Sequence, residues 1–168
     1  MQRRPHDSLC LAALCVLLFT GRCGLPTEDT SERETLRSID VLQAINFSLN
    51  VQRDNVLLLN GAYLSYTRQE VESRLDEGAG IRDIEYEQEF GDCDDFAFMT
   101  MEWVRNPVFG LKGIAFGVMK VRDSNRVAGH CVNIFVDHEM VVWVSDLKKK
   151  GSIMERADSS LIVFWVII

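Results

Sequence analysis

The sequence has no internal repeat, no low-complexity tract and little clustered positive charge. Its 168 residues carry a formal net charge of -7 at pH 7. Phosphate binding needs clustered Lys and Arg, and the compact basic run Lys148–Lys150 fits a turn between strands better. This excludes nucleic acid as a partner class. The length and a hydrophobic content of 47% fit one domain with a sizeable core.

The chain also lacks an apolar run that could comfortably cross a bilayer as a helix. Its leading apolar segment, Leu9–Phe19, is too short for that. Two arginines precede it, and this order is typical of an export signal. Arg22 fits a lipobox badly, which argues against a lipid anchor at Cys23. We expect residues 1–23 to be a signal peptide, with a retained anchor as the alternative. The mature protein is then secreted or periplasmic, without a membrane span.

Helical patterns come first along the chain. A flexible lead-in is expected over residues 24–34 and a single domain over 35–168. Two capping boxes, Ser31 with Glu34 and Thr67 with Glu70, mark helix starts. A third helix is expected to begin at Cys93 and to end at Asn106-Pro107. The expected helices therefore cover about 32–46, 68–77 and 93–105.

Strand patterns follow the third helix. The runs are short and are separated by polar turns, which favours antiparallel pairing. The last run, LIVFWVII, is apolar on both faces and is expected to be a central buried strand. Helices followed by an antiparallel sheet predict an α+β fold. The expected strands cover 113–121, 130–137, 140–145 and 161–168.

Three residues in order could form a thiol site. Cys93 opens the third expected helix, where backbone N–H groups and the helix dipole stabilise a thiolate. His130 begins one strand, and Asp146 ends the next. If His130 faces the helix start, Cys131 faces away, because side chains alternate along a strand. This arrangement fits nucleophilic catalysis, with Cys93 as nucleophile, His130 as base and Asp146 orienting the base.

The segment GDCDDFA around Cys93 resembles the nucleophile motif of bacterial transglutaminase-like cysteine peptidases. It is also similar to the C-terminal, papain-like domain of agglutinins of the Marasmius type. Gly129-His130 and the strands after it resemble the histidine and acid strands of that domain. The sugar-binding repeats of such agglutinins are absent. The resemblance implies a papain-like or transglutaminase-like fold, with the nucleophile at a helix start packed on the sheet.

The resemblance also implies an activity, an exported thiol hydrolase that cleaves peptide or amide bonds through an acyl-enzyme. Its partner would be a protein or peptide substrate, and its chemistry needs no cofactor. Gln88, five residues before Cys93, is a candidate oxyanion donor. Asp92, Asp94 and Asp95 are candidate ligands for calcium, since carboxylate oxygens suit a hard cation and the agglutinin-type relatives depend on calcium. Helix capping and first-turn charge account for the same acidic residues without a metal.

The cysteines are also compatible with roles that involve no catalysis. Two cysteines in an exported chain can form a disulfide, here Cys93–Cys131, or either thiol can be inert. A zinc site that also uses His130 and His138 matches no compact metal motif. The alternative function is a catalytically inactive, secreted interaction module with the same fold.

Overall fold

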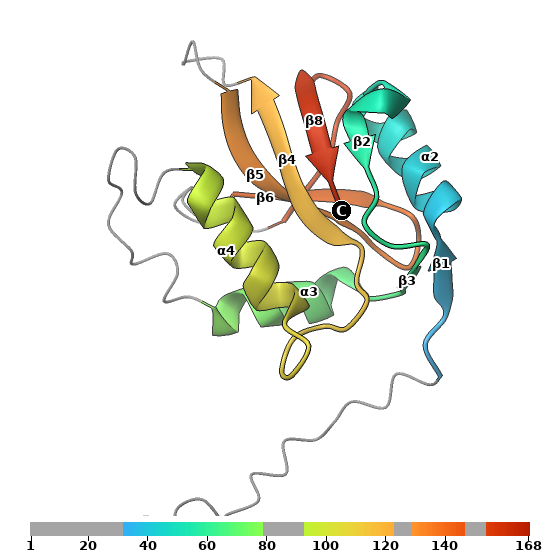
Figure 1. Cartoon of the computed structure of the whole chain (residues 1–168), viewed down its shortest axis with the longest axis vertical. Helices are drawn as coiled ribbons and strands as arrows, with labels where there is room; N and C mark the ends of the chain where they lie inside the picture. The colour runs from blue at the N-terminus through green and yellow to red at the C-terminus, as the bar shows by residue number, and fades with distance from the viewer. Residues whose placement is uncertain (1–31, 79–92, 123–128, 147–153) are drawn as a thin grey trace, which may run out of the picture.

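The computed structural model describes residues 32–78, 93–122, 129–146 and 154–168. It consists of a six-stranded sheet with helices on both faces (Figure 1). The predicted α+β class is confirmed. The predicted signal peptide, Gln88, Asp92 and the turn at 148–151 lie outside the described residues.

The described helices are α2 (Ser38–Leu49), α3 (Arg68–Glu77) and α4 (Cys93–Arg105), with a short 3-10 turn, η2 (Arg53–Asn55). None of them combines the length and apolarity that crossing a membrane requires. A small antiparallel pair is formed by β1 (Thr35–Arg37) and β3 (Ala62–Leu64). The large sheet contains, in spatial order, β2 (Val56–Leu57), β8 (Val163–Ile167), β4 (Phe116–Arg122), β5 (Gly129–Val136), β6 (Val142–Ser145) and β7 (Glu155–Arg156).

Strand β5 is covered on both faces. Val132, Ile134 and Val136 pack into the cluster that contains the buried side of α2. Alternate residues point to the other face, where Cys131 packs near Ala97 of α4. Phe135 joins the cluster of α3 and the end of α4. The sheet therefore lies between α2 on one face and α3 with α4 on the other, as Figure 1 shows.

A buried amide fastens α4 to the sheet. Asn133 is 2% exposed, and its Nδ2 donates to the carbonyl oxygens of Ala97 at 2.8 Å and Gly117 at 3.1 Å. Gly117 must be glycine, because a Cβ there would collide with the Ile167 carbonyl on the neighbouring strand. These contacts fix the height at which α4, and hence Cys93 at its start, rests on β5.

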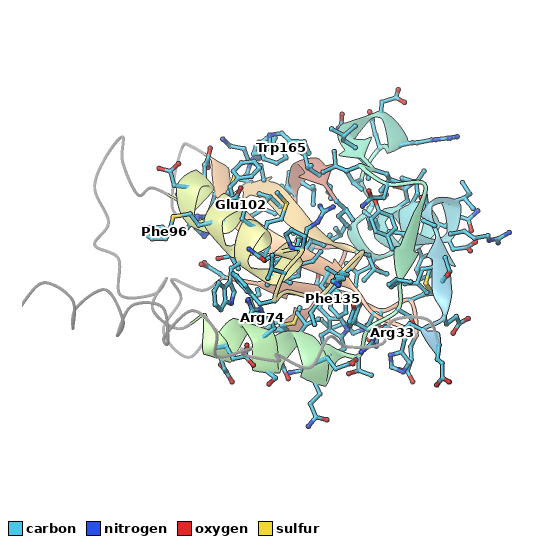
Figure 2. All side chains as sticks on the ribbon, turned by 60° about the horizontal axis from the view of Figure 1, so that its bottom comes forward. Arg33, Arg74, Phe96, Glu102, Phe135 and Trp165 are labelled. Carbon is cyan, nitrogen blue, oxygen red and sulfur yellow. The ribbon has the colours of Figure 1, made fainter. Side chains whose placement is uncertain are left out.

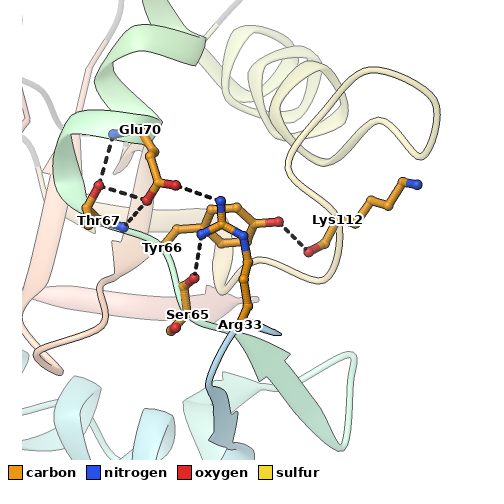
Figure 3. A network of polar contacts seen from close by, with 6 residues as sticks. All are labelled: Arg33, Ser65, Tyr66, Thr67, Glu70 and Lys112. Atoms are coloured by element: carbon orange, nitrogen blue, oxygen red, sulfur yellow. Dashed lines mark hydrogen bonds and ion pairs between the residues drawn. The ribbon is translucent and has the colours of Figure 1, made fainter. Parts of the chain in front are cut away.

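Helix α3 matches its prediction in both bounds. The Thr67 hydroxyl accepts from the Glu70 backbone N–H, and the Glu70 carboxylate accepts from the Thr67 N–H. Figure 3 shows how Arg33 extends this cap, because its guanidinium donates to Glu70 at 2.7 Å and to the Ser65 carbonyl at 3.2 Å. The same guanidinium lies over the Tyr66 ring. The cap therefore ties the segment before β1 to the start of α3.

The contact between α3 and α4 is built around Arg74. Its side chain is buried and lies between the two helices (Figure 2). The guanidinium lies 3.7 Å from the centre of the Trp103 ring and donates to the Trp103 carbonyl. Trp103 Nε1 donates in return to the Arg74 carbonyl at 3.1 Å. Burial of the cation is offset by these contacts and by the ion pair with Glu77.

The first helix differs from its prediction. It begins at Ser38 rather than near residue 32, because Leu36 belongs to β1 and is buried from there, paired with Tyr63. Ile39, in the first turn of the helix, is 44% exposed. The helix runs on to Leu49 and ends at Asn50, whose φ of 50° is a left-handed conformation that asparagine tolerates.

The two sheets contain short strands that no pattern predicted. β2, β3 and β7 are two or three residues long and are too short to show a period. β2 pairs in parallel with β8, whereas only antiparallel pairing was expected. β8 is internal in the sheet, as predicted, but Phe164 on it is 41% exposed.

Glu70 is expected to make stability depend on pH. Burial alone would raise the pKa of Glu70, but hydrogen bonds from Arg33 and Thr67 outweigh it and hold the pKa below its usual range. A lowered folded pKa adds stability above the unfolded pKa of about 4.3, and this stability is lost as pH falls through the folded pKa. Glu70→Gln should lower the unfolding free energy by about 1 kcal/mol near neutral pH, after allowance for solvent screening.

Urea denaturation at a series of pH values measures this difference. The difference should shrink as pH falls through the lowered pKa of Glu70 and disappear once the wild-type carboxyl is protonated as well. The matched control is Glu72→Gln on the same helix, which breaks a partly exposed pair with Arg68 and should cost about 0.3 kcal/mol. An equal loss for Glu70→Gln at acid and neutral pH would contradict the assignment.

Candidate functional site

Cys93 is the first residue of α4 and is half-buried. Its Sγ lies 3.5 Å from the backbone nitrogen of Cys131, which donates to it. The thiol also lies 3.3 Å from Asp94 Oδ1. The helix start and the Cys131 amide favour a thiolate, whereas the Asp94 carboxylate opposes one. The sequence correctly placed this cysteine at a helix start.

Cys131 lies beside it on the same face of the sheet. Its side chain is 3% exposed and packs with Ala97, Val118 and the partly buried Cys93. Burial raises the pKa of the Cys131 thiol far above its ordinary value, and the hydrogen bond and charge of Asp94 raise it further. The same hydrogen bond is the main reason why the pKa of Asp94 is lowered. Lys120 Nζ, 3.6 Å from Asp94 Oδ2, adds to that effect.

The two cysteines are not joined. Neither Cys93 nor Cys131 is in a disulfide bond. The Cys131 thiol is hydrogen-bonded to Asp94, and the Cys93 sulfur accepts from a backbone amide. The predicted alternative of a Cys93–Cys131 disulfide is therefore not the state of this structure, although the two residues are neighbours.

His130 and Asp146 are brought together. His130 Nε2 lies 2.7 Å from Asp146 Oδ2, across the ends of β5 and β6. The other ring nitrogen, Nδ1, is buried without a hydrogen-bond partner in the part of the chain that the structure describes. When Nε2 carries the ring proton, it donates to the Asp146 carboxylate.

The orientation of this strand is the reverse of the predicted one. Cys131 faces α4, and Asn133 on the same side bonds to the Ala97 carbonyl of that helix. By alternation, the side chain of His130 leaves β5 on the face of Val132 and Ile134, toward the side of α2. The expectation that His130 faces the helix start while Cys131 faces away is therefore wrong. The assignment of Cys93, His130 and Asp146 as site residues stays a prediction.

The candidate metal ligands that the structure describes lie apart from one another or contact other groups. Among the described residues, no group of three His, Cys, Asp or Glu side chains could hold an ion. Asp94 contacts Lys120 and Cys131, and Asp95 is exposed. His138 follows the far end of β5, which argues against the zinc alternative. A calcium site with Asp92, like the oxyanion role of Gln88, involves residues outside the described ranges.

Two surface grooves accompany these residues. One, of about 640 Å³, runs along the outer side of α4 and is lined by Leu59, Met99, Trp103 and Arg105 among others. The second, of about 540 Å³, lies between α2, the turn after β5 and the segment from Arg156 to Ser159. We call them the α4 groove and the α2 groove. No sequence pattern predicted either groove, because each joins side chains from distant segments.

Comparison with known proteins gives structural neighbours only. No protein-family model matches the chain, and no curated protein sequence matches it. One similar solved structure is the complex of PSL1a with E64, at a TM-score of 0.63 and 20% identity, covering 80% of this chain and 51% of that chain. Another is Polyporus squamosus lectin bound to the human-type influenza-binding epitope Neu5Acα2-6Galβ1-4GlcNAc. Its TM-score is 0.63 at 17% identity, over 80% of this chain and 49% of that one.

These neighbours show a shared fold, and the chain spans about half the length of the solved chains it matches. They are lectins, which contradicts the predicted family of papain-like and transglutaminase-like cysteine peptidases. The same finding contradicts the predicted thiol hydrolase activity and the predicted peptide substrate. The alternative, an interaction module without catalysis, is nearer to these neighbours.

The two cysteines should differ in reactivity. Cys93 is half-buried at a helix start, whereas Cys131 is buried beside a carboxylate that raises its pKa. Iodoacetamide at neutral pH should therefore alkylate Cys93 more than about tenfold faster, since one pKa unit changes the thiolate fraction tenfold. Peptide mapping by mass spectrometry measures both rates.

The unfolded chain is the control, in which both rates should become equal. Asp94→Asn should speed the labelling of Cys131 by removing the charge that raises its pKa. Equal rates in the folded protein would refute the difference in environment. Labelling that starts only after a reductant is added would mean a disulfide in solution.

Proposed function

We propose that this protein is a non-catalytic ligand-binding module and that its ligand class is carbohydrate. One observation carries the proposal, namely a fold shared over 80% of the chain with a lectin whose structure was solved with a bound glycan. Fold likeness alone is an analogy, so the surface must also offer the groups that a sugar needs.

A sugar ring presents hydroxyl groups around an apolar C–H face, so its site combines an aromatic side chain with carboxylate or hydroxyl groups. The α2 groove offers this combination, because it joins Phe47 to Ser48, Glu139 and Asp158. The α4 groove is lined mainly by apolar side chains, among them Leu59, Met99 and Trp103. Both grooves lie on the α+β core. We infer that the finer features of this fold follow the fold of the lectin neighbours.

A glycan panel tests the ligand class. The full chain should bind a subset of mammalian-type glycans with a Kd on the order of 0.1 mM, equivalent to about 5.5 kcal/mol. Isothermal titration calorimetry with the best panel members measures the affinity. Cys93→Ser is the matched control, since a sugar-binding module does not need the thiol, and it should bind like the wild type. Absence of binding to every glycan at millimolar concentration would refute the proposed function.

A second candidate role concerns the thiol, and one observation favours it. A structural neighbour was solved with E64, and Cys93 here lies half-buried at the start of α4. We propose that Cys93 can be captured by this epoxide. The thiolate attacks a ring carbon, the C–O bond breaks, and the alkoxide takes a proton from water. Such capture is a single binding event and implies no turnover.

Intact mass spectrometry after incubation with E64 should show one added molecule in the wild type and none in Cys93→Ser. Cys131→Ser should react like the wild type, because Cys131 is buried. Modification of Cys93→Ser, or no modification of the wild type after long incubation, would count against this role.

Two sequence-level expectations also remain proposals. Export rests on the charged and apolar pattern that ends at Phe19, and N-terminal sequencing of the mature protein tests it. Calcium binding by Asp92, Asp94 and Asp95 rests on the suitability of carboxylates for a hard cation. Calorimetric titration with calcium tests it, and no heat of binding at millimolar calcium would refute it.

A further inference from the structure

The α2 groove has an unusual aromatic residue at its rim. Phe47 is 91% exposed, although Val41, Ile45 and Leu49 of the same helix are buried in the core. A phenyl ring exposed this fully gains nothing for the fold, because its apolar surface stays in contact with water. Exposed rings beside a concave surface are typical of contact with a ligand.

The turn after β5 forms a second wall of the α2 groove, and its backbone is held rigid. Asp137 is 3% exposed, and its Oδ1 accepts from the backbone N–H groups of Glu139 and Val141, both at 2.9 Å. Its Oδ2 accepts from Trp143 Nε1 at 2.7 Å. Met140, inside the turn, has a φ of 62°. These contacts fix the backbone that carries Glu139, and a fixed wall lowers the entropy lost on binding.

The third wall is also fixed. The Ala157 N–H donates to the Val142 carbonyl at 2.8 Å, which ties the segment after β7 to β6. The Asp158 side chain accepts from the Ser160 backbone N–H. The Ser160 hydroxyl bonds to the same carboxylate. An ionised carboxylate has further lone pairs that can accept from a ligand. Phe47, Glu139 and Asp158 therefore come from three separate segments around one groove of about 540 Å³.

The charges of the groove select the ligand. Its lining includes two carboxylates, Glu139 and Asp158, and one cation, Arg156. The lining is therefore net negative, and the chain as a whole carries -7. Carboxylates accept hydrogen bonds from paired hydroxyl groups but repel an anionic sugar. A neutral hexose or N-acetylhexosamine meets these groups better than a sialic acid does.

We propose that the α2 groove binds a neutral terminal hexose or N-acetylhexosamine, stacked on Phe47 and hydrogen-bonded to Glu139 and Asp158. This rests on the proposed carbohydrate-binding function and adds the site and the sugar class. The groove thereby discriminates against the sialylated epitope found in the lectin neighbour, because that glycan brings a carboxylate to a negative surface.

Calorimetry on the full chain with two probes tests the site. The probes are Galβ1-4GlcNAc and the same disaccharide capped as Neu5Acα2-6Galβ1-4GlcNAc. The wild type should bind the uncapped probe about tenfold more tightly, the size of one unfavourable charge contact. Phe47→Ala should weaken that binding by about tenfold or more. The variant should fold normally, because Phe47 is almost fully exposed.

Charge variants separate binding from stability. Asp158→Asn keeps the side-chain oxygen that accepts from Ser160, so the turn should persist. The double variant Asp158→Asn with Glu139→Gln should bind the neutral probe more weakly. It should also show a smaller preference for the neutral probe over the sialylated one, a change that a purely structural role would not produce. Met99→Ala in the α4 groove is the matched control and should bind like the wild type.

The outcomes distinguish the two proposals. If the wild type binds no glycan in the panel, the carbohydrate function and the site fail together. If it binds glycans but Phe47→Ala and the charge variants do not change the affinity, only the α2 groove assignment fails. Tighter binding of the sialylated probe would overturn the charge argument.

Discussion

The double-sided burial of β5 constrains the rest of the molecule. A strand covered by α2 on one face and by α4 on the other cannot slip by one residue without exchanging its two sets of side chains. Val132, Ile134 and Val136 suit the large apolar cluster under α2. Asn133 suits the other face, where it binds the Ala97 carbonyl of α4. The register of β5 thus decides which of His130 and Cys131 meets Cys93.

Buried and half-buried polar groups then position the helices and the turn around this framework. Asn133 anchors α4, Asp137 holds the turn after β5, and Arg33 with Glu70 holds the start of α3. Each of these polar groups has a partner, so burying it costs little and fixes a geometry. The α2 groove depends on one of them, because the Asp137 carboxylate positions the backbone of Glu139.

The sequence predicted those features that local rules decide. The capping box of α3 and the start of α4 at Cys93 depend on residues a few positions apart, and both were predicted correctly. The class α+β followed from the order of the elements. The parallel pairing of β2 with β8 joins residues more than one hundred positions apart and left no local signal.

The candidate site around Cys93 shows more clearly that local sequence rules cannot predict contacts between distant segments. Alternation states that His130 and Cys131 face opposite sides, but it cannot say which side belongs to α4. The contacts of Asn133 and Phe135, which share the face of Cys131, determine which side of β5 packs against α4. The motif around Cys93 was informative about the local helix start, and it was misleading about activity, since the solved neighbours are lectins.

Strand β5 also separates the two candidate sites, which are the thiols of Cys93 and Cys131 and the α2 groove. Cys131 lies near the beginning of β5, and Asp137 directly follows its end. Six residues of strand separate them by roughly 20 Å, and the thiols lie on the face of α4 whereas the α2 groove adjoins the opposite helix. A sugar in the groove is too far away to contact Cys93. Loss of the thiol and loss of the groove are therefore separable experiments on one fold, and neither result can be produced by the other.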